Sequence, residues 1–164
     1  MIREARNAIL IENKSGRVSQ VPINIAETIL QGDLMVLTAG LATKATTAAS
    51  GATFLGVSDH TNPQSSAGTL TTDYGKPYIN IVQSGLVAMI AGASETLTGF
   101  QPLEVITDAQ HVKSSATAAN VVGIVDPGWA GPTGKAVVIG DLVKMWVHVP
   151  SKLQVWGPRV AAEV

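Results

Sequence analysis

The chain contains no cysteine, which excludes two kinds of covalent or metal-bound framework, and it contains few charged residues. Without cysteine, neither a disulfide framework nor a thiolate metal site can form. Charged residues make up 14% of the chain, against about 25% in typical soluble domains, although 46% of the residues are apolar. A surface composed largely of small neutral residues is suited to packing against neighbouring proteins.

Charge balance and hydropathy exclude two further kinds of partner. Eleven Lys and Arg residues stand against twelve Asp and Glu, so the chain lacks the basic excess that binds phosphates or anionic lipid. No stretch approaches the roughly 18 uninterrupted apolar residues of a membrane span, and Met1 to Arg6 is not followed by a long apolar segment. We therefore predict a protein made in the cytoplasm, unprocessed, with neither nucleic acid nor a membrane as partner.

Short runs rich in Val, Ile and Leu, separated by Gly and Pro turn signals, predict an all-β fold of the barrel or sandwich type. Helical periodicity is not sustained over about 11 residues without interruption. The predicted strands are 8–12, 34–38, 53–57, 78–82, 86–91, 103–107, 121–125, 135–139 and 143–149.

Several segments recur, which predicts an internally duplicated β unit. Leu34–Thr38 resembles Leu103–Thr107, and each is followed, after a stretch rich in Thr, Ala and Ser, by a similar end. Those ends are Phe54–Asp59 and Val121–Asp126. The two starts and the two ends are separated by almost the same length of chain, so the two units run nearly in step.

Glycines within these repeats have a predicted structural role. In Gly32-Asp33-Leu34, which recurs at Gly140-Asp141-Leu142, Gly accepts a positive φ, Asp binds a nearby backbone amide and Leu begins the core face. Gly56 and Gly123 interrupt apolar runs, where glycine usually marks a bulge or a close approach of another backbone. A role in ligand contact is the less favoured alternative.

The ends of the chain differ in character from the centre. Residues 1–30 contain one short strand and an isolated apolar segment with Pro22, and we interpret them as an extended N-terminal arm outside the core. Removal of this arm is then expected to leave the barrel folded. Residues 31–150 form the predicted β-barrel domain, and residues 151–164 form a C-terminal tail that is either a docking segment or a frayed terminus.

Catalytic, metal and nucleotide chemistry is not indicated. His60, His111 and His148 lack a partner at metal-ligand spacing, and no nucleophile elbow is present. We therefore predict no enzyme activity, no cofactor and no small-molecule substrate. The remaining candidates are acidic residues interpreted as solvated turn carboxylates, because nothing indicates that two of them converge: Glu95, Glu104, Asp108 and Asp126.

The segment from Gly128 to Ala136 is superficially similar to a phosphate-binding loop but fails its requirements. Trp129 stands where the first Gly is needed, Ala136 stands where a hydroxyl is needed, and the residues that follow predict a strand instead of a helix. The simpler interpretation is an exposed turn in which Trp129 is an interface anchor.

Taken in order, these elements resemble the capsid decoration (cement) proteins of tailed bacteriophages, the lambda-type β-tulip family and its larger relatives. The resemblance covers Gly32 to Val149, and its parts are Gly32–Val36, Leu41–Ala45, Phe54–Ser58 and Val121–Val125 in that sequence. Each part alone is common in β proteins, so the order and the spacing carry the comparison. The chain is longer than the smallest members at both ends.

The resemblance implies a β-tulip or related small barrel that forms a homotrimer on the outer surface of the virion capsid. There it would bind the major capsid protein and stabilise the shell against the internal pressure of DNA. The alternatives are a tail, spike or fibre module that binds host glycan or a tail protein, and a small hydrolase or lyase built on a barrel. The residues that we predict at capsid or subunit interfaces are Ile9, Leu10, Ile11, Ile23, Ile25, Trp129 and Trp156.

Overall fold

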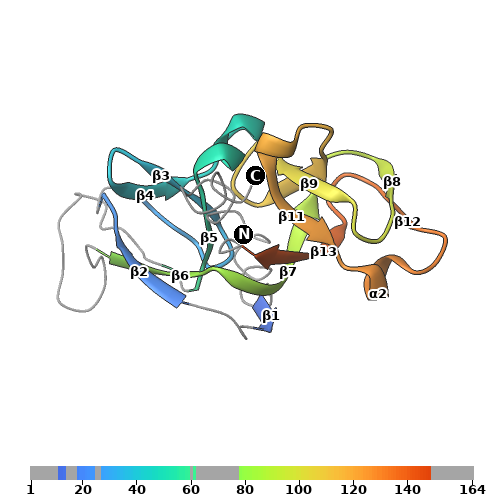
Figure 1. Cartoon of the computed structure of the whole chain (residues 1–164), viewed down its shortest axis with the longest axis horizontal. Coiled ribbons are helices and arrows are strands. Elements are labelled where there is room, and N and C mark those ends of the chain that lie inside the picture. The colour runs from blue at the N-terminus through green and yellow to red at the C-terminus, as the bar shows by residue number, and fades with distance from the viewer. Residues whose placement is uncertain (1–10, 14–17, 25–26, 60, 62–77, 149–164) are drawn as a thin grey trace, which may run out of the picture.

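The computed structural model describes residues 11–13, 18–24, 27–59, 61 and 78–148, and these residues are mostly in strands (Figure 1). The strands of the first half are β1 (Ile11–Asn13), β2 (Val18–Pro22), β3 (Leu34–Thr38), β4 (Leu41–Lys44), β5 (Phe54–Ser58) and β6 (Tyr78–Val82). Those of the second half are β7 (Ser84–Ala91), β8 (Glu95–Leu97), β9 (Pro102–Val105), β10 (His111–Ser114), β11 (Val121–Val125), β12 (Lys135–Val137) and β13 (Leu142–His148). The helical elements are η1 (Ala48–Thr53), η2 (Ala118–Asn120) and α2 (Pro127–Ala130).

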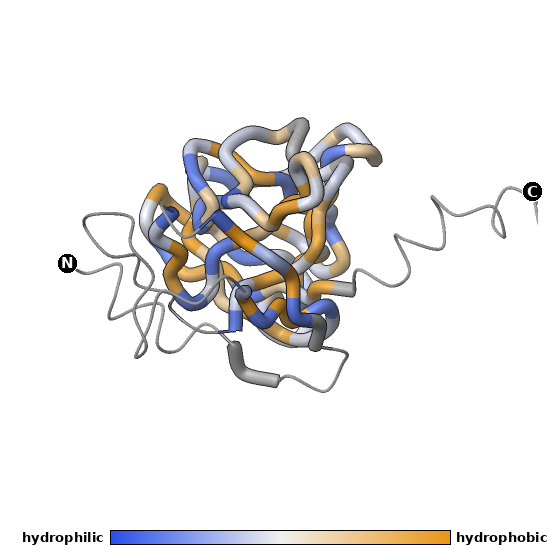
Figure 2. The backbone as a smooth tube through the Cα atoms, turned by 90° about the vertical axis from the view of Figure 1, so that its left-hand side faces the viewer, coloured by the Kyte–Doolittle hydropathy of each residue, from blue (hydrophilic) through white to orange (hydrophobic). Residues whose placement is uncertain are grey.

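The predicted all-β barrel class is confirmed, and it follows from the side-chain pattern of the strands. On β13, for example, Val143, Met145 and Val147 are buried and the residues between them are partly exposed. A two-residue alternation of this kind places one face of a strand in the core. Figure 2 shows hydrophobic and hydrophilic residues alternating along the backbone of the molecule.

The first five-stranded sheet has the order β2-β6-β5-β3-β4, and every pair is antiparallel. An isolated parallel bridge between Ile23 and Ala42 joins the two edges of this sheet. We call the result the first barrel. Its inner cluster consists of Ile23, Ile29, Met35, Ala42, Ile79 and Ile81.

The second sheet closes completely. Its ring runs β7-β10-β9-β11-β13 and returns to β7, with β10 parallel to β7 and the other pairs antiparallel. Strand β1 pairs with β7 outside this ring, and β8 pairs with β12 in a separate two-stranded ribbon. We call the ring the second barrel. The stretch of β7 that β10 does not reach is paired with β1 instead, so that edge is also covered.

The two barrels have the same strand order, so the predicted duplication is present in the fold. The parallel bridge of Ile23 with Ala42 corresponds to the pairing of Ala91 with Val112. The pairing of Met35 with Gly56 corresponds to that of Leu103 with Gly123. Ile23 to Ala91 and Met35 to Leu103 are the same distance apart in the chain, so both correspondences give one alignment. Residues 18–36 therefore match residues 86–104.

One repeated contact supports this alignment at the level of side chains. Glu27 Oε1 accepts a hydrogen bond from the amide of Lys44 at 3.2 Å, and Glu95 Oε1 accepts one from the amide of Ser114 at 2.9 Å. Lys44 and Ser114 occupy the same register position opposite Met35 and Leu103. Each glutamate begins a Glu-Thr-Ile or Glu-Thr-Leu triplet, a repeat that was not detected from the sequence alone.

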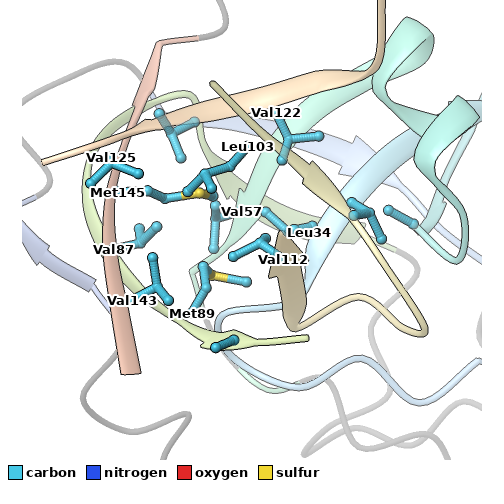
Figure 3. Packing of buried hydrophobic residues seen from close by; sticks show 14 of the residues in the cluster. Leu34, Val57, Val87, Met89, Leu103, Val112, Val122, Val125, Val143 and Met145 are labelled. Atoms are coloured by element: carbon cyan, nitrogen blue, oxygen red, sulfur yellow. The ribbon is translucent and has the colours of Figure 1, made fainter. Parts of the chain in front are cut away.

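The contact between the two barrels is formed by residues at non-equivalent positions of the two units. Leu34, Val36, Phe54 and Val57 of the first barrel belong to the same buried cluster as the interior of the second. Figure 3 shows Leu34 and Val57 beside Leu103, Val112 and Met89. The positions equivalent to Leu34 and Val36 in the second barrel are Pro102, which is exposed, and Glu104, so the contact is not symmetric.

The prediction that residues 1–30 form an arm outside the core is wrong for the part that the structure describes. Strand β2 pairs with β6 along its whole length, from Val18 opposite Val82 to Pro22 opposite Tyr78. Ile23, predicted at an interface, is only 5% exposed and lies in the inner cluster of the first barrel. The edge of β6 needs a partner strand, and the N-terminal segment supplies it.

Gly56 and Gly123 have the structural role that the sequence predicted. The pairing register shifts beside each of them. A Cβ on Gly56 would lie 2.4 Å from the carbonyl oxygen of Val82, and one on Gly123 would lie 2.8 Å from that of Trp146. Both glycines therefore permit a close approach of a neighbouring backbone at a bulge.

Candidate interaction surfaces

Within the described residues, no group of three or more His, Cys, Asp or Glu side chains is placed to hold a metal ion. His111 Nδ1 lies 2.8 Å from Asp108 Oδ1, a local contact between residues three apart. His60 lies outside the described residues, and for His148 the structure describes only the backbone, in β13. None of the helices that the structure describes has both the length and the hydropathy to cross a membrane.

Trp129 lies on α2, between Asp126 and the start of β12. Its amide donates to Asp126 Oδ2 at 3.2 Å, its ring packs partly buried against the core, and Lys135 Nζ lies 4.8 Å from the ring centroid. Because Lys135 begins a strand, the preceding loop does not open a helix as a phosphate-binding loop must. Much of Trp129 is thus engaged within its own chain, and the structure does not test its predicted role as an interface anchor.

Three of the four acidic residues interpreted as solvated turn carboxylates, Asp126, Glu95 and Glu104, instead hold internal structure. Asp126 caps α2 and also accepts a hydrogen bond from the indole Nε1 of Trp146 at 3.0 Å. Glu95 Oε2 accepts one from the Ser114 hydroxyl at 2.5 Å, in addition to its bond with the Ser114 amide. Neither role could be predicted from the sequence, because the partners Ser114 and Trp146 are 19 and 20 residues away in the chain.

Glu104 is the third of these residues and, unlike the other two, is buried; it is 7% exposed and lies on the outer face of the second barrel. Its Oε2 accepts hydrogen bonds from the Ser115 hydroxyl at 2.6 Å and from Asn120 Nδ2 at 3.4 Å, and Lys113 Nζ lies 3.5 Å from Oε1. Burial alone would raise the pKa of Glu104, but the hydrogen bonds and the Lys113 charge together hold the pKa below its ordinary value. A carboxylate with a lowered pKa is a weak base, so the cluster is suited to stabilising the barrel.

This cluster predicts a component of stability that is lost in acid. A carboxyl whose pKa is lower in the folded protein adds stability above its ordinary pKa of 4.5, and that stability disappears as the pH falls through the folded value. We expect Glu104→Gln to be less stable than the parent at pH 7 and to lose less on acidification. Thermal unfolding of both proteins between pH 7 and pH 3 measures this. Parallel curves would contradict the assignment.

The first exposed apolar surface is the turn Thr98–Gln101, which we call the Phe100 turn. The Phe100 side chain is 67% exposed, and its φ of +66° is uncommon for a residue with a bulky side chain. Gln101 Oε1 accepts from the Thr98 amide at 2.9 Å, and the Gln101 amide donates to the Thr98 carbonyl at 3.2 Å. These two hydrogen bonds, one of them made by the Gln101 side chain, hold the turn in the conformation that exposes Phe100.

The second exposed surface consists of the turn 138–141 between β12 and β13 together with Leu142, the first residue of β13. We call it the Ile139 turn. Val138, Ile139 and Leu142 are 59%, 66% and 40% exposed. As predicted for the recurring Gly-Asp-Leu motif, Gly140 has a positive φ of +99° and Asp141 Oδ2 accepts from the Val138 amide at 3.0 Å. Leu142, however, does not begin a core face. The register of β8 with β12 places the two turns at opposite ends of this ribbon.

The interface residues predicted from the sequence are only partly within the described chain. Ile9, Leu10, Ile25 and Trp156 lie outside it, Ile11 belongs to β1, Ile23 is buried and Trp129 is partly buried. Phe100 was not predicted at all, and Val138 and Ile139 were interpreted as a strand end. Their only sequence signal is apolar character within glycine-containing turns, which becomes informative once exposure is known.

No model of a known protein family matches the chain, and no curated protein matches its sequence. The functional conclusion therefore depends on the residues, the fold and the exposed surfaces described above.

Proposed function

We propose that this protein is a capsid decoration protein that binds as a homotrimer to the outer surface of a tailed-phage head and stabilises the shell. The proposal joins the resemblance over Gly32 to Val149 with a fold made of two packed barrels. Its work is adhesion to the major capsid protein, without a catalytic step, a cofactor or a small-molecule substrate.

The observation that carries the proposal is the Ile139 turn. Three large apolar side chains project from this one turn in a chain that has few charges and small neutral residues on much of its surface. Exposed apolar patches of this kind on a soluble protein mark contact with another protein. The internal hydrogen bond to Asp141 holds the turn in one conformation, which lowers the entropy cost of binding.

Adhesion at several equivalent points explains how a small patch can stabilise a shell. After one subunit of a trimer binds, the other two contacts become intramolecular, which can raise the apparent affinity by about 10² to 10⁴ without any new contact. A trimer bound across the boundary between capsid subunits favours the closed shell by its binding free energy. This requires that the distance between binding sites on the mature shell match the distance between the subunits of the trimer.

We expect the double variant Val138→Ser and Ile139→Ser to lose most of its occupancy on expanded shells while its thermal unfolding is nearly unchanged. The reason is that both side chains are exposed in the free protein and would be buried only against the shell. The measurement is the amount of protein that sediments with expanded shells assembled from the proposed partner, the major capsid protein.

The matched control is the double variant Ala116→Ser and Ala119→Ser, which also changes two exposed residues to serine on the second barrel. We expect the control to bind as the parent does. Failure of the parent protein to bind expanded shells, while its oligomeric state is intact, would overturn the proposed function.

A further inference from the structure

Two equivalent turns of the duplicated fold have opposite environments. Leu30–Asp33 in the first barrel matches the Phe100 turn in the second, in the same alignment that the strand pairing gives. In each turn the fourth side chain accepts a hydrogen bond from the first amide, at 2.9 Å in both cases, and the third residue has a positive φ. The third residue is Gly32 in one turn and Phe100 in the other.

The turn of the first barrel is covered by the second barrel of the same chain. The amide of Leu34 donates to the carbonyl of Ala109 at 2.8 Å, and Gln110 Nε2 donates to Asp33 Oδ1 at 2.9 Å. Gly32, Asp33 and Leu34 are all buried there. The surface that receives this turn is therefore the loop between β9 and β10.

The internal contact joins the turn Leu30–Asp33 to the β9–β10 loop. The equivalent surfaces, the Phe100 turn of the second barrel and the β3–β4 turn of the first, are both exposed. In the second barrel, Phe100 is 67% exposed and Pro102, the equivalent of Leu34, is exposed. In the first barrel, the β3–β4 turn corresponds to the β9–β10 loop; Thr38, Ala39 and Gly40 are exposed and Leu37 is 43% exposed. Figure 1 places the β3–β4 hairpin at one end of the long axis and the β8–β12 ribbon at the other.

A contact that uses different surfaces on two equivalent units is heterologous. Such contacts form a closed ring where the rotation between units closes and an open filament where it does not. Phe100 adds a second argument. A bulky side chain with a positive φ and a large exposed area weakens an isolated monomer on both counts, whereas glycine occupies the equivalent position in the first barrel. A partner surface that buries the ring gives this residue a physical role.

We propose that the Phe100 turn of one copy docks against the β3–β4 turn of the next copy, so that identical chains associate head to tail in a ring. The occupant of the Phe100 surface is a second copy of this chain. The contact between copies is apolar, formed by Phe100 and Leu37, because Pro102 has no N–H to repeat the bond of Leu34 and Gly40 has no side chain to repeat that of Gln110. The number of copies, three, rests on the proposed function. The head-to-tail arrangement, in which the Phe100 turn of one copy contacts the β3–β4 turn of the next, rests on the two turns alone.

The first test uses Phe100→Gly, which introduces the residue found at the equivalent position of the first barrel. We expect at least a tenfold increase in the dissociation constant for self-association, measured by sedimentation over a range of concentrations, with the circular dichroism spectrum and unfolding transition retained. Leu37→Ser, on the opposite surface, is expected to have the same effect. The double variant Val138→Ser and Ile139→Ser is the control and is expected to associate as the parent does.

The second test uses the absence of native cysteine. Under oxidising conditions, Leu37→Cys and Phe100→Cys should each remain uncrosslinked alone, and a mixture of the two should form a disulfide-linked dimer. Crosslinking of either variant with itself would indicate a symmetric contact and overturn the proposal, as would unchanged association of Phe100→Gly. An intact oligomer that does not bind shells would instead count against the proposed function only.

Discussion

Deletion of residues 1–24 is expected to abolish cooperative folding of this protein. The deletion removes β2, all of which pairs with β6, and Ile23, which is buried inside the first barrel. Truncating one buried isoleucine to alanine typically costs about 2–5 kcal/mol, and a whole domain is stable by only about 5–15 kcal/mol. Loss of a complete strand together with a core side chain therefore exceeds the available stability.

The comparison protein lacks residues 1–10 only, and so keeps every residue that the structure describes. We expect this shorter deletion to retain a cooperative thermal transition and the β-type circular dichroism spectrum. A protein without residues 1–24 that still unfolds cooperatively would show that β2 is dispensable, as an arm would be. That outcome would restore the interpretation based on the sequence.

Asp33→Ala is expected to destabilise the protein by about 3–5 kcal/mol, because it removes a buried, hydrogen-bonded carboxylate. Asp33 is 1% exposed; it accepts from the Leu30 amide within its turn and from Gln110 Nε2 in the second barrel. The Gln110 side chain is fully buried, so no solvent replaces the lost acceptor. The bond between residues 77 apart also ties the two barrels together.

Asp141→Ala is the matched control, because the same turn occurs there on the surface. Its carboxylate accepts from the Val138 amide at 3.0 Å, as that of Asp33 does from Leu30, but the residue is exposed. We expect a loss of about 0.5–1 kcal/mol, since water can replace an exposed hydrogen-bond partner. Urea unfolding of both variants measures the difference, and equal losses would show that the contact between the barrels adds nothing.

Most of the strands could be predicted from the sequence, and the exceptions have a common cause. Strands β3, β6 and β11 match their predicted bounds, because runs of Val, Ile and Leu between glycines indicate strands directly. Strands β2, β4, β8 and β10 were missed because none of them contains an apolar run: β4, β8 and β10 have a single buried side chain each, and β2 places two polar residues between Val18 and Val21. Their strand conformation comes from pairing with β6, β3, β12 and β9, respectively.

The duplication was also visible in the sequence, but its alignment was not. The ends at Gly56 and Gly123 correspond as the sequence indicated, whereas the starts were aligned one residue out of register, because Met35 and not Leu34 corresponds to Leu103. The turn before β9 has the same geometry as the turn before β3, but the hydrogen bond that Asp33 makes in the first turn is made by Gln101 in the second. A hydrogen-bond role that two different side chains can perform does not appear as sequence similarity.

By itself, the sequence determined the all-β class, most strands, the two repeated units and the conformation of the Gly-Asp turns, because these depend on neighbours within a few residues. Only the tertiary structure decided that β2 belongs to the first barrel, that Glu104 and Asp126 hold internal contacts, and that Phe100 and the Ile139 turn are exposed. Burial depends on which distant surfaces meet. Two nearly equivalent turns can therefore have the same backbone and opposite environments, as Gly32 and Phe100 do.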